Sequence, residues 1–158
     1  MVSIALTFTQ RLPAPRDRKC IDGKQFIGEL ALDAEARGRS RGRYRIKGSG
    51  SERDILLQLP RGTILTDGDL LAATSGEFLQ VRAQPEPVAI VRAEDPLVLL
   101  RAAYHLGNRH VPLEVRVDCL MLAADPVLEQ MAIQLGATVD AALAPFHPER
   151  GAYRHHLH

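Results

Sequence analysis

The chain has 158 residues, of which 46% are hydrophobic and 25% charged, and its net charge is +1 with the histidines neutral. This composition is typical of a globular protein with one large domain or two small ones, and the charge balance does not favour a nucleic-acid binder. No stretch approaches the roughly 20 apolar residues that a membrane-spanning helix needs. Aromatic residues make up only 4%, so the core must consist mainly of Leu, Ile, Val and Ala.

The N-terminal stretch MVSIALTFTQRLPAPRDRK places its basic residues after a short apolar run, which is the wrong order for a secretory signal. The two cysteines, Cys20 and Cys119, are far apart in the sequence and form no C-x-x-C motif. We therefore expect reduced thiols that pack as small hydrophobic residues, and a cytoplasmic protein.

Up to about Gln84 the pattern predicts strands and turns. RYRIK alternates basic and apolar residues, and ILLQL and GEFLQVRA are short apolar-rich runs. TILTDGDLL places an Asp-Gly turn between two apolar pieces, whereas GELALDAEA is ambiguous between strand and helix. We predict an all-β domain over residues 1–84, followed by a linker at QPEP (84–87), because two prolines remove two backbone donors there.

Beyond VAIVRA, which we expect to be a strand, the segment DPLVLLRAAYHLGN predicts a helix. Asp95 is a suitable N-cap and Pro96 suits the first helical position. Gly107 with Asn108 predicts a left-handed stop. One face of this helix carries the apolar residues Leu97, Leu100 and Tyr104.

The segment DPVLEQMAIQLG repeats this arrangement, with Asp125 as the cap, Pro126 at the first position and Gly136 as the stop. Its apolar face has the helical spacing i, i+3, i+4, i+7 and consists of Leu128, Met131, Ala132 and Leu135.

VPLEVRVD and CLMLAA predict two strands between the helices, and ATVDAALA predicts a weak closing strand. The order β-α-β-β-α-β is that of a ferredoxin-like domain, which we place at residues 85–145. Both apolar helix faces are then expected to be buried against one face of an antiparallel sheet. The fold class is α+β, with a flexible histidine-containing tail over 146–158 that we expect to be loose from Pro145 on.

No catalytic motif is found: GSGSER places Arg53 where a dinucleotide-binding loop needs its third glycine, and the adjacent Glu94 and Asp95 are explained by helix capping. A basic cluster lies in the N-terminal half. It consists of Arg37, Arg39, Arg41, Arg43, Arg45 and Lys47. Because alternate residues of a strand face opposite sides, the pattern favours a solvated strand face with Tyr44 and Ile46 pointing inward. If the cluster binds anything, a protein partner is favoured over RNA.

Four of the six histidines lie in the last twelve residues. Composition leaves two interpretations of them open, divalent metal binding and an exposed polar tail. His105 falls in the last turn of the first predicted helix, where a cation complements the helix C-terminus, so a structural role is favoured. His110 follows the helix stop and is expected to project from a corner. Two copies of His110, brought together by a two-fold axis, would make half of a metal site.

The segment YHLGNRHVPLEV (104–115) closely resembles the signature of the UreE family of urease accessory proteins, which are nickel metallochaperones. LPRGTILTDGDLL and PFHPERGAY also resemble family segments, and matching segments cover nearly the whole chain in order. The resemblance implies an N-terminal β domain that contacts protein partners and a ferredoxin-like domain that forms a head-to-head homodimer.

The resemblance also implies that His110 binds nickel together with its symmetry mate. Tail histidines complete the coordination: His155, His156 and His158, with His147 a weaker candidate. It implies Ni2+ as the cargo, with Zn2+ or Cu2+ also able to bind. The implied partners are the urease accessory GTPase (UreG) and the urease apoprotein complex, with no nucleic acid or membrane involved and no enzymatic activity. CLMLAADP carries no histidine and the tail is short, so one metal per dimer is expected rather than bulk storage.

Two alternatives come from other classes of protein. A small basic RNA- or protein-binding module would treat the histidines as incidental. A hydrolytic metalloenzyme would need a carboxylate beside the histidines, and only Glu114 and Glu149 lie near them in the sequence.

Overall fold

The computed structural model describes residues 6–12, 25–47 and 52–151, and the chain divides into two compact units, Met1–Gln84 and Pro85–His158. Cys20, the glycine-rich part of GSGSER, and His155, His156 and His158 lie outside the described residues. No helix in the described part of the chain is long and apolar enough to cross a membrane.

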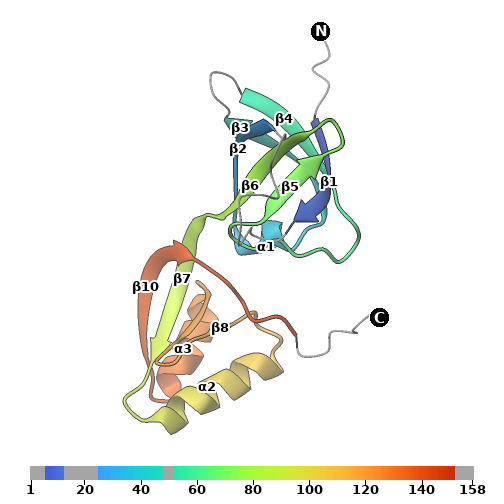
Figure 1. Cartoon of the computed structure of the whole chain (residues 1–158). Helices are drawn as coiled ribbons and strands as arrows, with labels where there is room; N and C mark the ends of the chain where they lie inside the picture. The colour runs from blue at the N-terminus through green and yellow to red at the C-terminus, as the bar shows by residue number, and fades with distance from the viewer. Residues whose placement is uncertain (1–5, 13–24, 48–51, 152–158) are drawn as a thin grey trace. The chain divides into compact units, whose positions relative to one another are not determined.

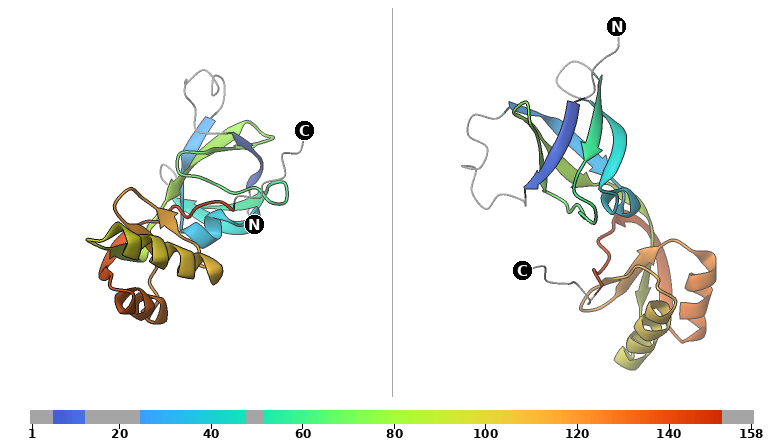
Figure 2. Two further views of the ribbon diagram at one scale, coloured as in Figure 1. Left: turned by 90° about the horizontal axis from the view of Figure 1, so that it is seen from below. Right: turned by 90° about the vertical axis from the view of Figure 1, so that its right-hand side faces the viewer.

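The first unit is a six-stranded sheet with one short helix (Figure 1). The strands are β1 (Leu6–Leu12), β2 (Gln25–Leu32), β3 (Arg41–Lys47), β4 (Glu52–Gln58), β5 (Leu70–Ala73) and β6 (Glu77–Ala83). Their order is β2-β6-β5-β1-β4-β3, with parallel pairing of β1 with β4 and of β2 with β6. The sheet curls, as Figure 2 shows, and it encloses a mainly aliphatic core. Its fully buried members include Phe8, Ile55, Leu57, Leu71 and Leu79.

The predicted β domain is therefore confirmed, with one addition. GELALDAEA contains both structures that its pattern allowed, because β2 ends at Leu32 and the helix α1 (Ala34–Arg37) follows at once. Asp33 caps α1 by accepting the N–H of Ala36 at 2.7 Å. The predicted Asp-Gly turn is also present, and Gly68 takes a φ of 85° just before β5.

A buried ion pair ties β1 to this turn. The Asp69 side chain is 1% exposed and accepts two hydrogen bonds from the Arg11 guanidinium, at 2.6 and 3.2 Å. It also accepts the main-chain N–H of Thr66 at 2.7 Å. A buried carboxylate is tolerated only when it is paired and hydrogen-bonded in this way. The pair therefore fixes the register of the turn against the first strand.

The second unit has the element order predicted from the sequence. Its elements are β7 (Pro85–Arg92), α2 (Pro96–Asn108), β8 (Glu114–Val115), β9 (Leu120–Ala123), α3 (Pro126–Gln134) and β10 (Thr138–Pro145). The strand order β10-β7-β9-β8 with antiparallel pairing throughout is the ferredoxin-like arrangement, so the predicted α+β fold class is confirmed. Both helices pack on the same core as Val91, Leu120 and Leu122.

The expected linker of the second unit was wrong. The predicted linker residues Pro85–Pro87 form the start of β7 and pair with β10. Prolines are tolerated there because β7 pairs with β9 only from Val88 onward, so one side of the strand has no ladder to interrupt. The predicted closing strand is confirmed as β10, which pairs with β7 at eight successive positions.

The burial of α2 also differs from the prediction. Leu97, Leu100 and Tyr104 were expected in the core, but they are 48%, 68% and 66% exposed. The core side of the helix is formed instead by Ala102 and Leu106, with Val98, Leu99 and Ala103 partly buried. Because PLVLLRAAYHL is apolar almost all round, its periodicity does not decide which side faces the sheet. The predicted face of α3 does pack on the core.

Candidate metal centre

The helix α2 brings His105 to its last turn and His110 to the corner behind it. The helix begins as predicted, with the Asp95 carboxylate accepting the N–H of Leu97 at 2.9 Å and Pro96 at the first position. It ends in two reverse hydrogen bonds: His110 donates to the carbonyl of Gly107 at 2.9 Å, and Val111 donates to that of Leu106 at 3.2 Å. This pair of bonds is a Schellman motif, and it holds the backbone of His110 in one conformation.

His110 itself is the left-handed residue of this motif, with a φ of 57°. The prediction of a left-handed stop at Gly107 or Asn108 was therefore wrong, because both residues belong to the helix. Among the residues that the structure describes, His110 is the only one other than glycine with a positive φ. The same motif ends α3, where the left-handed position is taken by the predicted Gly136.

A histidine in this conformation is held against its own preference. The left-handed region costs a residue with a Cβ about 1–2 kcal/mol, whereas glycine enters it freely. His110 is also exposed, so its imidazole contributes no core packing that would offset this cost. Non-glycine residues in sparsely populated backbone regions cluster at functional sites, so the geometry itself marks His110 as a functional candidate.

His105 has a different environment. Its side chain is half-buried, and its ring meets the Tyr104 ring edge-on with the centroids 5.4 Å apart. Its main-chain carbonyl accepts a hydrogen bond from the Arg109 guanidinium at 3.1 Å. Its place in the last helical turn is as predicted, and these contacts agree with a structural role at the helix end.

The chain after β10 is not loose from Pro145 on, as we had expected. Phe146 is buried, and the N–H groups of His147 and Glu149 donate to Glu114 Oε2 at 2.8 Å and to the carbonyl of Leu113 at 2.6 Å. Figure 1 shows this segment leaving β10 and running toward β8. The side chain of His147 is exposed.

Within the described part of the chain, no group of three or more His, Cys, Asp or Glu side chains could hold a metal ion. Of the predicted ligands, the structure places His110, at an exposed corner three residues before Leu113, and the weaker candidate His147, which is also exposed. His155, His156 and His158 lie outside the described residues.

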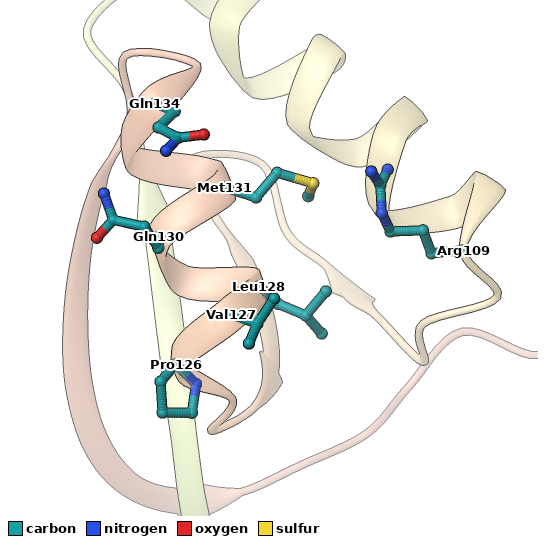
Figure 3. Close-up of a pocket in the computed structure, with 7 residues that line it drawn as sticks. All are labelled: Arg109, Pro126, Val127, Leu128, Gln130, Met131 and Gln134. Atoms are coloured by element: carbon teal, nitrogen blue, oxygen red, sulfur yellow. The ribbon is translucent and has the colours of Figure 1, made fainter.

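A groove of about 520 Å³ lies between α3 and the end of α2 (Figure 3). Leu128 and Met131 project from α3 toward the end of α2 that carries Arg109, whereas Gln130 points to the other side. The lining contains no histidine, cysteine or carboxylate and is therefore unsuited to a metal ion.

The basic strand β3 follows the predicted alternation, with Ile46 buried and Tyr44 partly buried. Acidic residues of β4 neutralise one end of it: Arg45 contacts Asp54 at 2.8 Å and Glu52 at 3.8 Å. Arg37 was predicted to be solvated, but it is only 4% exposed, because it closes α1 rather than lying on the strand. The free positive charge is thus smaller than the sequence suggested.

Comparison with known proteins identifies the chain. The model of the C-terminal domain of the UreE urease accessory protein matches residues 86–158, and that of its N-terminal domain matches residues 8–84. The chain belongs to the UreE family. A UreE from Microcystis aeruginosa is 47% identical over 96% of this chain and 94% of its own length, and one from Ralstonia nicotianae is 45% identical over 94% and 68%. A UreE from Burkholderia pseudomallei is 59% identical over 63% of this chain and 49% of its own length.

UreE membership confirms the resemblance carried by the histidine segment and assigns the chain to the accessory proteins of urease, which are not enzymes. The structure gives an independent reason to set aside a hydrolytic role for Glu114. One of its carboxylate oxygens accepts from Arg116 at 2.7 Å and the other from the main chain of His147. The carboxylate is therefore engaged by the protein itself.

Sequence reasoning missed two features beside the candidate site, the exposed apolar face of α2 and the attachment of the C-terminal segment to β8. The sequence did carry a signal for the exposed apolar face of α2. A helix that is apolar on all sides is expected to be covered on all of them, and not only on the side that faces its own sheet. The second had none, because a main-chain contact between residues far apart in the sequence leaves no periodic trace.

Proposed function

We propose that this UreE is a nickel-binding metallochaperone that delivers Ni2+ during assembly of the urease active site. The observation that carries the proposal is the geometry of His110, which the Schellman motif holds in a strained, exposed conformation. Neutral imidazole is a suitable ligand for Ni2+, and it also binds Cu2+ and Zn2+, so selection of nickel must come from coordination number, partners and supply.

The proposed site is shared by two chains. A homodimer places two His110 side chains across a two-fold axis, and they are joined by tail residues drawn from His155, His156 and His158. A site that is split between subunits can open to release its metal, which suits delivery, whereas structural metal sites are closed.

The exposed face of α2 supports the homodimer. Leu97, Leu100 and Tyr104 lie along one side of the helix and lead toward the corner that carries His110. Burying them against a second copy removes their apolar surface from water, and an isologous contact through this helix brings the two corners together. Leu100→Glu is therefore expected to convert the dimer to monomer, which light scattering measures. A control, Leu143→Glu, changes a residue of similar exposure on β10.

The further partners that we propose are the accessory GTPase UreG and the urease apoprotein complex, with the N-terminal β unit as a surface for contact. Support comes from family membership, because the relatives are named for a urease accessory role.

The deciding experiment is nickel titration of the purified protein with the mass of each species measured. We expect one Ni2+ per dimer. His110→Ala should remove high-affinity binding without unfolding the protein, and His105→Ala should change it much less. A chain ending at Gly151 should still bind one Ni2+ per dimer, but more weakly. Several metals per dimer, all lost with the tail, would refute the proposed site.

A further inference from the structure

The segment Phe146–Glu149 follows the last strand and is attached by two hydrogen bonds to Leu113 and Glu114, at the start of β8. Phe146 is buried, His147 donates its main-chain N–H to Glu114, and Glu149 donates its own to the carbonyl of Leu113. The Glu114 side chain is only 13% exposed and is held from the other side by Arg116, with both guanidinium contacts between 2.6 and 2.7 Å. Its carboxylate is therefore fixed before the C-terminal segment reaches it.

These contacts fix the point from which the end of the chain departs. Leu113 is three residues after His110, so the two are at most about 10 Å apart along the chain. Six residues lead from Glu149 to His155, and six extended residues span about 20 Å. The attachment to β8 thus brings the start of the tail within reach of His110, whichever path the last residues take.

We propose that Glu114 is a positioning residue, which, together with the main-chain bond from Glu149 to Leu113, clips the C-terminal segment beside His110 and so raises the effective concentration of the tail histidines at the metal. The proposal rests on the function proposed above and names a residue that sets the affinity of that site without binding the metal. We call these two hydrogen bonds the tail clip.

The size of the effect follows from chain closure. With the clip intact, the tail is anchored at Glu149, six residues before His155. If only the Glu114 bond is lost, the anchor stays at Glu149; if only the Glu149 bond is lost, the anchor is His147, eight residues before His155. With both hydrogen bonds lost, the nearest anchor is the buried Phe146, nine residues before it. Effective concentration falls roughly as the −3/2 power of the length, so the loss is about two-fold for one tail and about four-fold when both tails of a dimer contribute.

Two pairs of variants separate the clip from other roles of the same residues. Glu114→Ala removes the acceptor for His147, whereas Glu114→Gln keeps an oxygen that can accept. Glu149→Pro removes the N–H that donates to Leu113, whereas Glu149→Ala keeps it. Competition of Ni2+ against a chelator should show about two- to four-fold weaker binding when Glu114→Ala and Glu149→Pro are combined, and nearly unchanged binding when Glu114→Gln and Glu149→Ala are combined. Glu149→Pro alone should weaken binding about 1.5- to 2.5-fold and Glu114→Ala alone very little, because one hydrogen bond of the clip remains in each. If the combined variant fails to fold, Glu149→Pro against Glu149→Ala still tests the clip.

The same variants are then placed in the chain that ends at Gly151. Without tail histidines the clip has nothing to position, so the combined Glu114→Ala and Glu149→Pro variant should no longer change nickel affinity. Hydrogen exchange supplies a readout that does not involve metal, since the amide of His147, which loses its acceptor, should exchange faster in Glu114→Ala even in the metal-free protein.

Three results would overturn the clip, and they differ in whether they also refute the proposed tail ligands. A loss of affinity that persists in the truncated chain means that Glu114 and Glu149 act through the fold. A truncation that weakens binding, together with unchanged binding in the combined Glu114→Ala and Glu149→Pro variant, refutes the clip and leaves the proposed ligands standing. A truncation with no effect refutes both the tail ligands and the clip.

Discussion

Replacing His110 by glycine is expected to stabilise the metal-free protein while removing its nickel site. The left-handed backbone costs the histidine about 1–2 kcal/mol. Glycine relieves this strain, but its freer unfolded chain costs about 0.5–1 kcal/mol. Because the imidazole is exposed and replaces no core contact, the net gain is about 0.5–1 kcal/mol.

Two further variants fix the interpretation. His110→Ala keeps the strain and loses only an exposed side chain, so its stability should stay within about 0.5 kcal/mol of the parent. Gly136→Ala makes the reverse change in the equivalent motif of α3 and should cost about 1 kcal/mol. The Cβ added at Gly136 would lie 3.8 Å from the nearest Val98 atom, which is an ordinary contact, so this cost is conformational and not steric.

Urea unfolding followed by far-ultraviolet circular dichroism reports on this region, because α2 and α3 are both in the second unit. Protein concentration must be held fixed, since a dimer gains stability with concentration. The expected order of stability is His110→Gly above the parent, and the parent level with His110→Ala. A glycine variant less stable than the parent would refute the reasoning, because it would show that the histidine side chain holds the corner in place.

Three other changes have defined outcomes. Nickel affinity should fall steeply between about pH 7 and pH 5, because an imidazole ligand must be neutral and histidine ordinarily has a pKa of about 6.5. Nickel titrations at several pH values measure this, and an affinity that does not change with pH would point to carboxylate or thiolate ligands. Burial, aided by the nearby Asp118, raises the pKa of the Cys119 thiol. In a Cys20→Ala background, an alkylating reagent near neutral pH should therefore modify Cys119 much faster in the unfolded protein than in the folded one. Equal rates would contradict the burial of Cys119. Asp69→Ala should destabilise the first unit by about 2–3 kcal/mol, because the partly exposed Arg11 guanidinium and the main-chain N–H of Thr66 both lose a charged acceptor. Urea unfolding measures this, and a loss below about 1 kcal/mol would show that water replaces the partner.

The sequence predicted the parts of the fold that depend on local chemistry. The two Asp-Pro helix starts are present as expected, because a cap and a proline at the first position act within one turn. The Gly136 stop and the alternation of β3 also depend only on near neighbours. The ferredoxin-like order then followed from the succession of elements.

The errors fall where tertiary contacts decide. The prolines of the expected linker are accommodated in β7 because its partner β9 stops at Ala123, which no local pattern reveals. The side of α2 that faces the sheet is set by the packing of Ala102 and Leu106, a small and a large side chain. The sequence did not single out these two residues, because the helix is apolar on nearly all sides. The left-handed position is taken by His110 and not, as predicted, by Gly107. The helix continues through Gly107, although glycine usually prefers the position just after a helix end.

That displacement is also what links the fold to the proposed function. A helix that placed Gly107 at the left-handed position would have less backbone strain, since glycine adopts the left-handed conformation freely. By continuing to Asn108, the helix gives the strained position to the proposed metal ligand, and two hydrogen bonds and the packing of Val111 on the core hold its backbone there. The imidazole is thereby placed at a fixed corner, at the end of an exposed apolar face and three residues before the strand that receives the C-terminal segment. On the proposed function, the strain at His110 is the free-energy cost of placing the proposed ligand between the exposed face of α2 and the attached segment Phe146–Glu149.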